Sequence, residues 1–102
     1  MPRSKRIRAT HQTARSVKGW GKAKPKTQRE RKALARRCGR RAFMVPATLA
    51  FPVMGKRAKG CKVDCRGLRE AKQRASTHKR KYPGLVKRID ALGKRAGCKW
   101  AR

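Results

Sequence analysis

The sequence predicts a mainly α protein: a small αα-hairpin domain with an irregular apolar segment and a long basic N-terminal arm. Three observations support this prediction. Apolar residues recur at helical spacing in the last third of the chain, two prolines interrupt the central apolar run, and the first 26 residues contain no acid. Of 102 residues, 33 are Lys or Arg and four are Asp or Glu, which gives a formal net charge of +29. This length leaves room for one small domain.

The predicted arm covers residues 1–26, and a small Cys-containing helical domain covers residues 27–102. The arm holds nine Lys or Arg residues and only Ile7, Val17 and Trp20 as sizeable apolar side chains. Such a segment buries too little surface to offset its ordering entropy, so we expect it to be disordered unless a partner binds it. Gly and Pro residues make its end a flexible connector.

The first helix of the domain is expected over residues 28–38. Thr27 and Glu30 have the spacing of a capping box, in which both side chains accept hydrogen bonds from free backbone N–H groups at the helix start. Gly39 stands where a C-cap is expected. The helix therefore has local signals at both ends, although its apolar face is weak.

An apolar run over residues 42–54 follows this helix. Pro46 and Pro52 each remove a backbone donor, so an irregular or edge-strand segment across the core is expected in place of a central strand. Phe43 and Phe51 lie among aliphatic residues, and we interpret them as core anchors and not as platforms for stacking bases.

Two further helices should pack as an antiparallel αα-hairpin. Asp64 is the expected N-cap of the first, which runs to about residues 78–80. Its apolar face consists of Leu68, Ala71 and Ala75. The face of the second consists of Leu85, Ile89, Leu92 and Ala96, with Gly97 as its stop. A helix-turn-helix DNA reader is the alternative, but the connection is longer than the usual three or four residues.

Four cysteines, Cys38, Cys61, Cys65 and Cys98, lie within the domain. Antiparallel packing of the last two helices should bring Cys61 or Cys65 close to Cys98, and Cys38 could join them. Tetrahedral zinc, two disulfides and free buried thiols all stay open. The spacing C-x22-C-x3-C-x32-C lacks the paired short knuckles of a zinc ribbon, and an ordinary cytosolic protein would keep disulfides reduced.

The composition predicts a polyanionic partner, with nucleic acid as the first candidate, because 29 positive charges could match roughly 15 base pairs of duplex phosphate. The residues expected to contact phosphate or another anionic surface are Arg3, Lys5, Arg6, Arg8, Arg15, Lys18, Lys22, Lys24 and Lys26 of the arm and Arg66, Arg69, Lys87, Arg88 and Lys94 of the domain.

Several function classes find little support in the sequence. No paired carboxylates, phosphate-cradling glycine loop or nucleophile motif occurs, so we expect no enzyme and no small-molecule substrate. We expect no transmembrane segment or secretory signal, because the longest apolar run is too short. The Arg-rich start is similar to a mitochondrial transit peptide but lacks the amphipathic run of large apolar residues.

Part of the chain resembles a group of small basic virion proteins of large nucleocytoplasmic DNA viruses. The resemblance lies within residues 37–101 and is carried by Arg37–Gly39, Phe43–Pro46, Phe51–Val53, Cys61–Leu68, Ala71, Arg74–Ala75 and Gly97–Ala101. The group pattern has cysteines near positions 42 and 54, where this chain has Ala42 and Met54.

The resemblance implies a structural protein of the virion, either a minor capsid component or a protein bound to the packaged genome. The implied partners are other capsid proteins or nucleic acid in a large assembly, with membrane contact open. The implied location is the virion, and the host cytoplasm or nucleus during assembly. Such viruses encode thiol oxidation machinery, so the resemblance favours disulfides over zinc.

Two other classes compete with this interpretation. A ribosomal protein would combine the same small globule and basic extension, with the arm threaded through RNA and Trp20 or Tyr82 stacked on a base. A sequence-specific DNA-binding regulator needs base-reading side chains on one exposed helix face. Basic residues lie on every predicted helix, so the sequence supports the regulator least.

Overall fold

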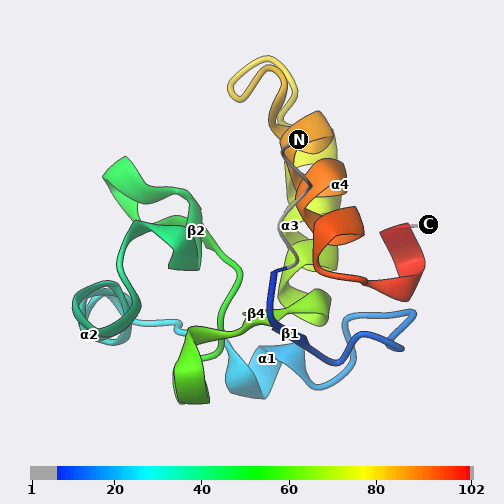
Figure 1. The fold of residues 1–102 in the computed structure, drawn as a ribbon. Coiled ribbons are helices and arrows are strands. Elements are labelled where there is room, and N and C mark those ends of the chain that lie inside the picture. The colour runs from blue at the N-terminus through cyan, green and yellow to red at the C-terminus, as the bar shows by residue number, and fades with distance from the viewer. Residues whose placement is uncertain (1–6, 102) are drawn as a thin grey trace, which may run out of the picture.

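Two helices, α3 (Cys65–Thr77) and α4 (Leu85–Arg95), lie side by side in the computed structural model, which describes residues 7–101 (Figure 1). Residues 78–84 connect them. Leu68 of α3 and Ile89 of α4 are fully buried between the helices and the rest of the core. Asp64 caps α3 by accepting a hydrogen bond from the backbone N–H of Arg66 at 2.9 Å, which confirms the predicted N-cap. The fold is mainly α.

Helix α2 (Gln28–Cys38) has the predicted bounds and the predicted capping box. The Thr27 hydroxyl accepts the backbone N–H of Glu30 at 3.1 Å, and the Glu30 carboxylate accepts the backbone N–H of Thr27 at 3.1 Å. Gly39 ends the helix with a φ of 78°, a left-handed value that favours glycine. Local sequence signals therefore define this helix at both ends.

The central apolar run forms a small antiparallel hairpin. Strand β2 (Phe43–Val45) pairs with β3 (Ala50–Pro52), and the short 3-10 turn Pro46–Thr48 connects them. Pro52 faces Phe43 at the end of this ladder, where a missing N–H costs least. Phe43 is buried and anchors the core as predicted, whereas Phe51 is only half-buried. Three further 3-10 turns are Arg40–Ala42, Lys59–Cys61 and Lys99–Ala101.

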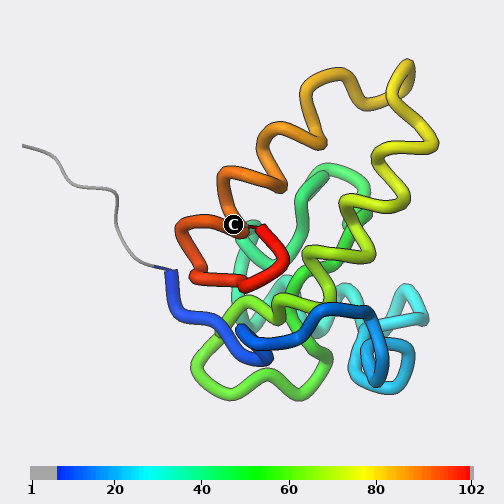
Figure 2. Tube along the Cα trace, turned by 90° about the vertical axis from the view of Figure 1, so that its right-hand side faces the viewer, coloured from blue at the N-terminus to red at the C-terminus, as the bar shows by residue number. Residues whose placement is uncertain are grey.

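Residues 7–26 differ from the expected disordered arm, because they pack against the rest of the chain (Figure 2). Strand β1 (Ala9–Thr10) pairs in parallel with β4 (Val63–Asp64). The short helix α1 (Trp20–Ala23) begins at Trp20, whose side chain has an exposed fraction of 0%. Residues 1–6, the remainder of the expected arm, lie outside the described residues.

The physical reason for this difference is long-range packing that local composition does not reveal. The Trp20 ring lies against the bare backbone of Gly67 in α3. The Gln12 side chain donates a hydrogen bond to the Ala96 carbonyl at 2.7 Å, and the backbone carbonyl of Gln12 accepts the Lys99 backbone N–H at 2.7 Å. The buried Trp20 indole, the buried Pro25 and these bonds hold a segment that is otherwise largely polar.

The C-terminal residues cover the base of the helix pair. Trp100 donates a hydrogen bond from its indole N–H to the Cys65 carbonyl at 2.8 Å and packs against Gly93 of α4. Each of the two long helices thus receives a tryptophan ring at a glycine. Within residues 7–101, no helix combines the length and apolar character that crossing a membrane requires.

Candidate nucleic-acid interface

Each of the four acidic residues lies beside a cation of the same chain. The closest ion pairs are Glu30–Lys56 at 3.5 Å, Asp64–Arg66 at 2.7 Å, Glu70–Lys24 at 3.1 Å and Asp90–Lys72 at 2.9 Å. The acids therefore offset charge locally, and they leave most of the exposed Lys and Arg side chains to meet an anion from outside.

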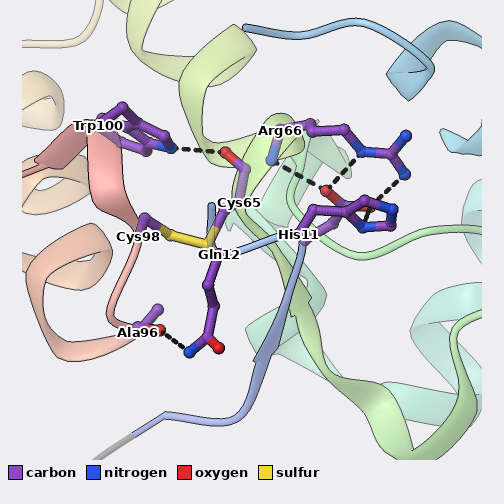
Figure 3. The surroundings of a disulfide bond; sticks show 8 residues. His11, Gln12, Cys65, Arg66, Ala96, Cys98 and Trp100 are labelled. Atoms are coloured by element: carbon purple, nitrogen blue, oxygen red, sulfur yellow. Dashed lines mark hydrogen bonds and ion pairs between the residues drawn. A yellow bond between two sulfur atoms is a disulfide. The ribbon is translucent and has the colours of Figure 1, made fainter. Parts of the chain in front are cut away.

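Asp64 is the most buried of these acids, with an exposed fraction of 4%. Its carboxylate accepts hydrogen bonds from the Arg66 backbone N–H at 2.9 Å and from the guanidinium at 3.0 and 2.7 Å. The His11 Nδ1 lies 3.4 Å away (Figure 3). The hydrogen bond to Asp64 raises the pKa of Arg66. Arg66, predicted to contact phosphate, is thus engaged inside the fold.

Two more of the predicted contacts are partly withdrawn from solvent. Lys24 is half-buried and donates a hydrogen bond to Glu70 at 3.1 Å. Arg69, in α3, is also half-buried. Lys24 and Arg66 are thus engaged in ion pairs within the fold, and Arg69 is partly withdrawn from solvent.

The other described members of the predicted set are exposed. In the N-terminal segment these are Arg8, Arg15, Lys18, Lys22 and Lys26. On α4 they are Lys87 and Lys94, on the side opposite the buried Leu85 and Ile89. Arg88 is also exposed, and its guanidinium donates a hydrogen bond to the Met44 carbonyl at 3.4 Å. Arg3, Lys5 and Arg6 lie outside the described residues. The structure thus places the exposed cations in separate groups and does not gather them into one cleft.

Two of the exposed groups of Lys and Arg that the predicted set lacks lie on or beside the long helices. One is a stripe on α2, in which Arg29, Lys32 and Arg36 follow one another at i, i+3 and i+7 opposite the buried Leu34. The other is the turn between α3 and α4, where Lys79, Arg80 and Lys81 are all exposed at the far end of the helix pair (Figure 1). Helical spacing alone was enough to find the α2 stripe.

The chain matches no protein-family model, and no curated protein or solved structure is similar to it. The resemblance to virion proteins therefore stays a prediction from the sequence.

The cysteines form two separate disulfides, Cys38–Cys61 and Cys65–Cys98. Cys65 lies next to Cys98, as antiparallel packing predicts, but Cys38 joins Cys61 away from that pair. Among the described residues, no group of three or more His, Cys, Asp and Glu side chains could hold a metal. Because all four cysteine sulfurs are paired in disulfides, no thiolate is left to bind zinc.

The capping carboxylate of α2 is held in its charged form. Backbone N–H groups of Lys26 and Thr27 donate to Glu30 at 2.8 and 3.1 Å, and these bonds, with the nearby Lys56, lower the pKa of Glu30 from 4.5 to about 2. The negative charge stabilises the positive start of α2. Glu30 does not neutralise the α2 stripe, because the ion-pair partner of Glu30 is Lys56.

Proposed function

We propose that the chain is a non-enzymatic structural protein of a large double-stranded DNA virus particle. In this role it is a minor capsid or internal virion component that neutralises an anionic partner, such as genome DNA or acidic capsid faces. One observation carries the neutralising role. All four acids are engaged in ion pairs within the chain, while exposed cations lie on α2, on α4, on the N-terminal segment and on the turn between α3 and α4.

The distribution of these cations favours neutralisation over sequence reading. A reader of duplex sequence presents a few base-contacting side chains on one element that fits a groove. Here the exposed Lys and Arg side chains occupy several sides of a small molecule, which suits diffuse contact with phosphates and the release of their counterions.

The two disulfides favour a particle component over a ribosomal protein. Ribosomes work where glutathione and thioredoxin keep thiols reduced, and disulfides persist mainly in oxidising settings or on particle surfaces. Disulfides fit the thiol oxidation that the resemblance to virion proteins implies. Purification of the source particle tests this part: recovery with ribosomal subunits and absence from virions would contradict it.

Salt dependence of DNA binding tests the neutralising role. The affinity for a duplex of about 15 base pairs should fall steeply between about 50 and 200 mM salt, because each phosphate contact contributes about 0.9 to the slope of log K against log salt. The triple variant Arg29→Gln, Lys32→Gln, Arg36→Gln should lower that slope. A flat response to salt would contradict phosphate neutralisation.

A matched control uses cations that are engaged in ion pairs. Lys56→Gln and Lys72→Gln also remove positive charge, but these side chains face Glu30 and Asp90. They should leave the salt slope nearly unchanged. The stripe variant removes three charges and the control two. If both change the slope equally for each charge removed, net charge alone governs binding and the exposed stripe has no special part.

A further inference from the structure

A hollow of about 410 Å³ lies between the β2–β3 hairpin, the end of α3 and the turn that follows it. Its walls combine aromatic and apolar side chains with cations, and this combination is typical of small-molecule sites of about 300–1,000 Å³. Of the exposed cations described above for neutralisation, Lys81 also lines the hollow, whereas the groups on α2 and α4 lie outside it. Its chemistry therefore indicates a separate binding role.

Two aromatic rings form one wall. Phe51 and Tyr82 meet edge to face, with ring centroids 5.1 Å apart, and both side chains are half-buried. Phe51 has a φ of 56°, a left-handed value that is rare for a bulky residue and recurs at functional sites. Pro52 and Ala71, both buried, complete the apolar part of the lining. An aromatic face in such a wall can stack on a planar ring.

Cations line the rest of the hollow. Arg31 donates to the Leu49 carbonyl at 3.3 Å, and the Lys81 Nζ lies 5.5 Å from the centre of the Tyr82 ring. Arg74 has a side chain that is 62% exposed and lies 3.5 Å from Glu70. Glu70 is the only acid among the described lining residues, so the hollow is positive overall.

We propose that this hollow takes one unpaired base of a nucleic-acid strand, with its ring against Tyr82 and Phe51 and its phosphate near Arg74 and Lys81. The inference rests on the proposed nucleic-acid role and adds a preference to it. Stacking on an aromatic side chain is available only to a base that has left the duplex stack. The chain should therefore discriminate between a single strand and a duplex of the same sequence.

The first test compares affinities of the full, disulfide-bonded chain for a single-stranded oligonucleotide and for its duplex at one salt concentration. Tyr82→Leu should weaken single-strand binding by about tenfold, the effect expected from one lost stacked base. It should change duplex binding little. Tyr82→Phe, which keeps the ring, should restore the preference. Equal loss for both ligands in Tyr82→Leu would overturn the proposal.

Arg74→Gln provides a variant that does not depend on the aromatic wall, since its side chain is mostly exposed. It should weaken single-strand binding more than duplex binding. Lys87→Gln on α4 removes the same charge outside the hollow and should weaken both equally. If Arg74→Gln behaves as Lys87→Gln does, the hollow has no role.

A second readout is photochemical. A single strand with 5-iodouracil at one position should cross-link to Phe51 or Tyr82, as identified by mass spectrometry of the digested protein. Cross-links only to residues outside the hollow would overturn the proposal. Steep salt dependence with no strand preference would reject the hollow alone, whereas a flat salt response would reject the proposed function itself.

Discussion

Residues 7–26 and the pair of helices α3 and α4 are both highly basic, but different forces hold them. The helices bury a repeated apolar face, with Leu68, Leu85 and Ile89 almost completely covered. In the N-terminal segment only Trp20 and the smaller Pro25 are fully buried, supplemented by a strand pair of two residues and a few hydrogen bonds. Order in a highly charged chain can thus depend on a repeated pattern or on a single anchor.

The two regions should therefore respond differently to the loss of a buried side chain. A repeated apolar face distributes its contribution to stability over many residues, so single losses weaken it by degrees. A segment with one anchor should detach as a unit when the anchor is removed, and local opening of this kind costs less than global unfolding. Substitutions in the two regions test this contrast.

Replacing the anchor should have the largest effect. Trp20→Ala removes a fully buried indole and should lower the free energy of unfolding by about 3–5 kcal/mol. Hydrogen exchange should show that the amides of Trp20 and Lys24 lose protection before those of α3 and α4. Val17→Ala, at a half-buried position of the same segment, should have a much smaller effect. Amides that already exchange freely in the wild-type segment would contradict the contrast.

Removing the disulfide that joins the start of α3 to the residues after α4 should have the next largest effect. Cys65 and Cys98 are 33 residues apart, so the double change Cys65→Ala, Cys98→Ala should lower the free energy of unfolding by about 3–4 kcal/mol. Cys38 and Cys61 are 23 residues apart, so the double change Cys38→Ala, Cys61→Ala should lower the free energy of unfolding slightly less. Thermal unfolding of both variants measures the difference.

Mass spectrometry tests the two disulfides directly. The mass of the unreduced chain should be lower than that of the reduced chain by two hydrogen atoms for each bond. Alkylation of any cysteine without prior reduction would contradict the pairing, and a bound zinc ion in the native mass would contradict it as well.

A smaller effect is expected where Trp20 meets α3. A Cβ at residue 67 would lie 2.7 Å from the Trp20 ring, so Gly67→Ala should destabilise the fold by about 1–3 kcal/mol despite the better helix propensity of alanine. Gly21→Ala is the matched control in α1, since no atom lies within 4 Å of its added Cβ. Equal melting temperatures for the two variants would show that the Trp20 ring does not lie against Gly67.

The smallest effect concerns α2, whose signals are entirely local. Because the pKa of Glu30 is lowered from 4.5 to about 2, its contribution to stability is complete above about pH 4.5 and is lost as the pH falls towards 2. Glu30→Gln should remove this part of the acid dependence, measured as the free energy of unfolding against pH. Thr27→Ala should cost about 1 kcal/mol at every pH. Parallel curves for wild type and Glu30→Gln would contradict the capping role.

The helices could be predicted because their signals are close in sequence. The capping box at Thr27 and Glu30, the N-cap Asp64 and the spacing of Leu85 and Ile89 each act within a few residues. The packing of residues 7–26 could not be predicted, because it depends on the meeting of Trp20 with a glycine in a distant helix. Composition reports how much apolar surface a segment has, but not where that surface finds a partner.

Some of the basic residues predicted to contact an anion are exposed, whereas others are engaged in ion pairs within the chain. Lys87 and Lys94 lie on the side of α4 opposite its buried residues, as an amphipathic helix requires, whereas Arg88 donates a hydrogen bond to the Met44 carbonyl. Arg66 is held by Asp64, the residue that also caps its helix, and Lys24 by Glu70 in a distant element. The first of these pairs could have been anticipated from the separation of two residues, whereas the second could not.

The order of the two disulfides along the chain has a mechanical consequence. They close two consecutive covalent rings, residues 38–61 and 65–98, and only residues 62–64 link one ring to the next. This link contains β4, which β1 pairs with, so the N-terminal strand covers the one extensible joint between the rings. A pull on the chain ends could lengthen the joint and the two outer segments, but not the residues inside the rings. Once the segment before Cys38 has been pulled out, such a chain should lengthen little further under tension.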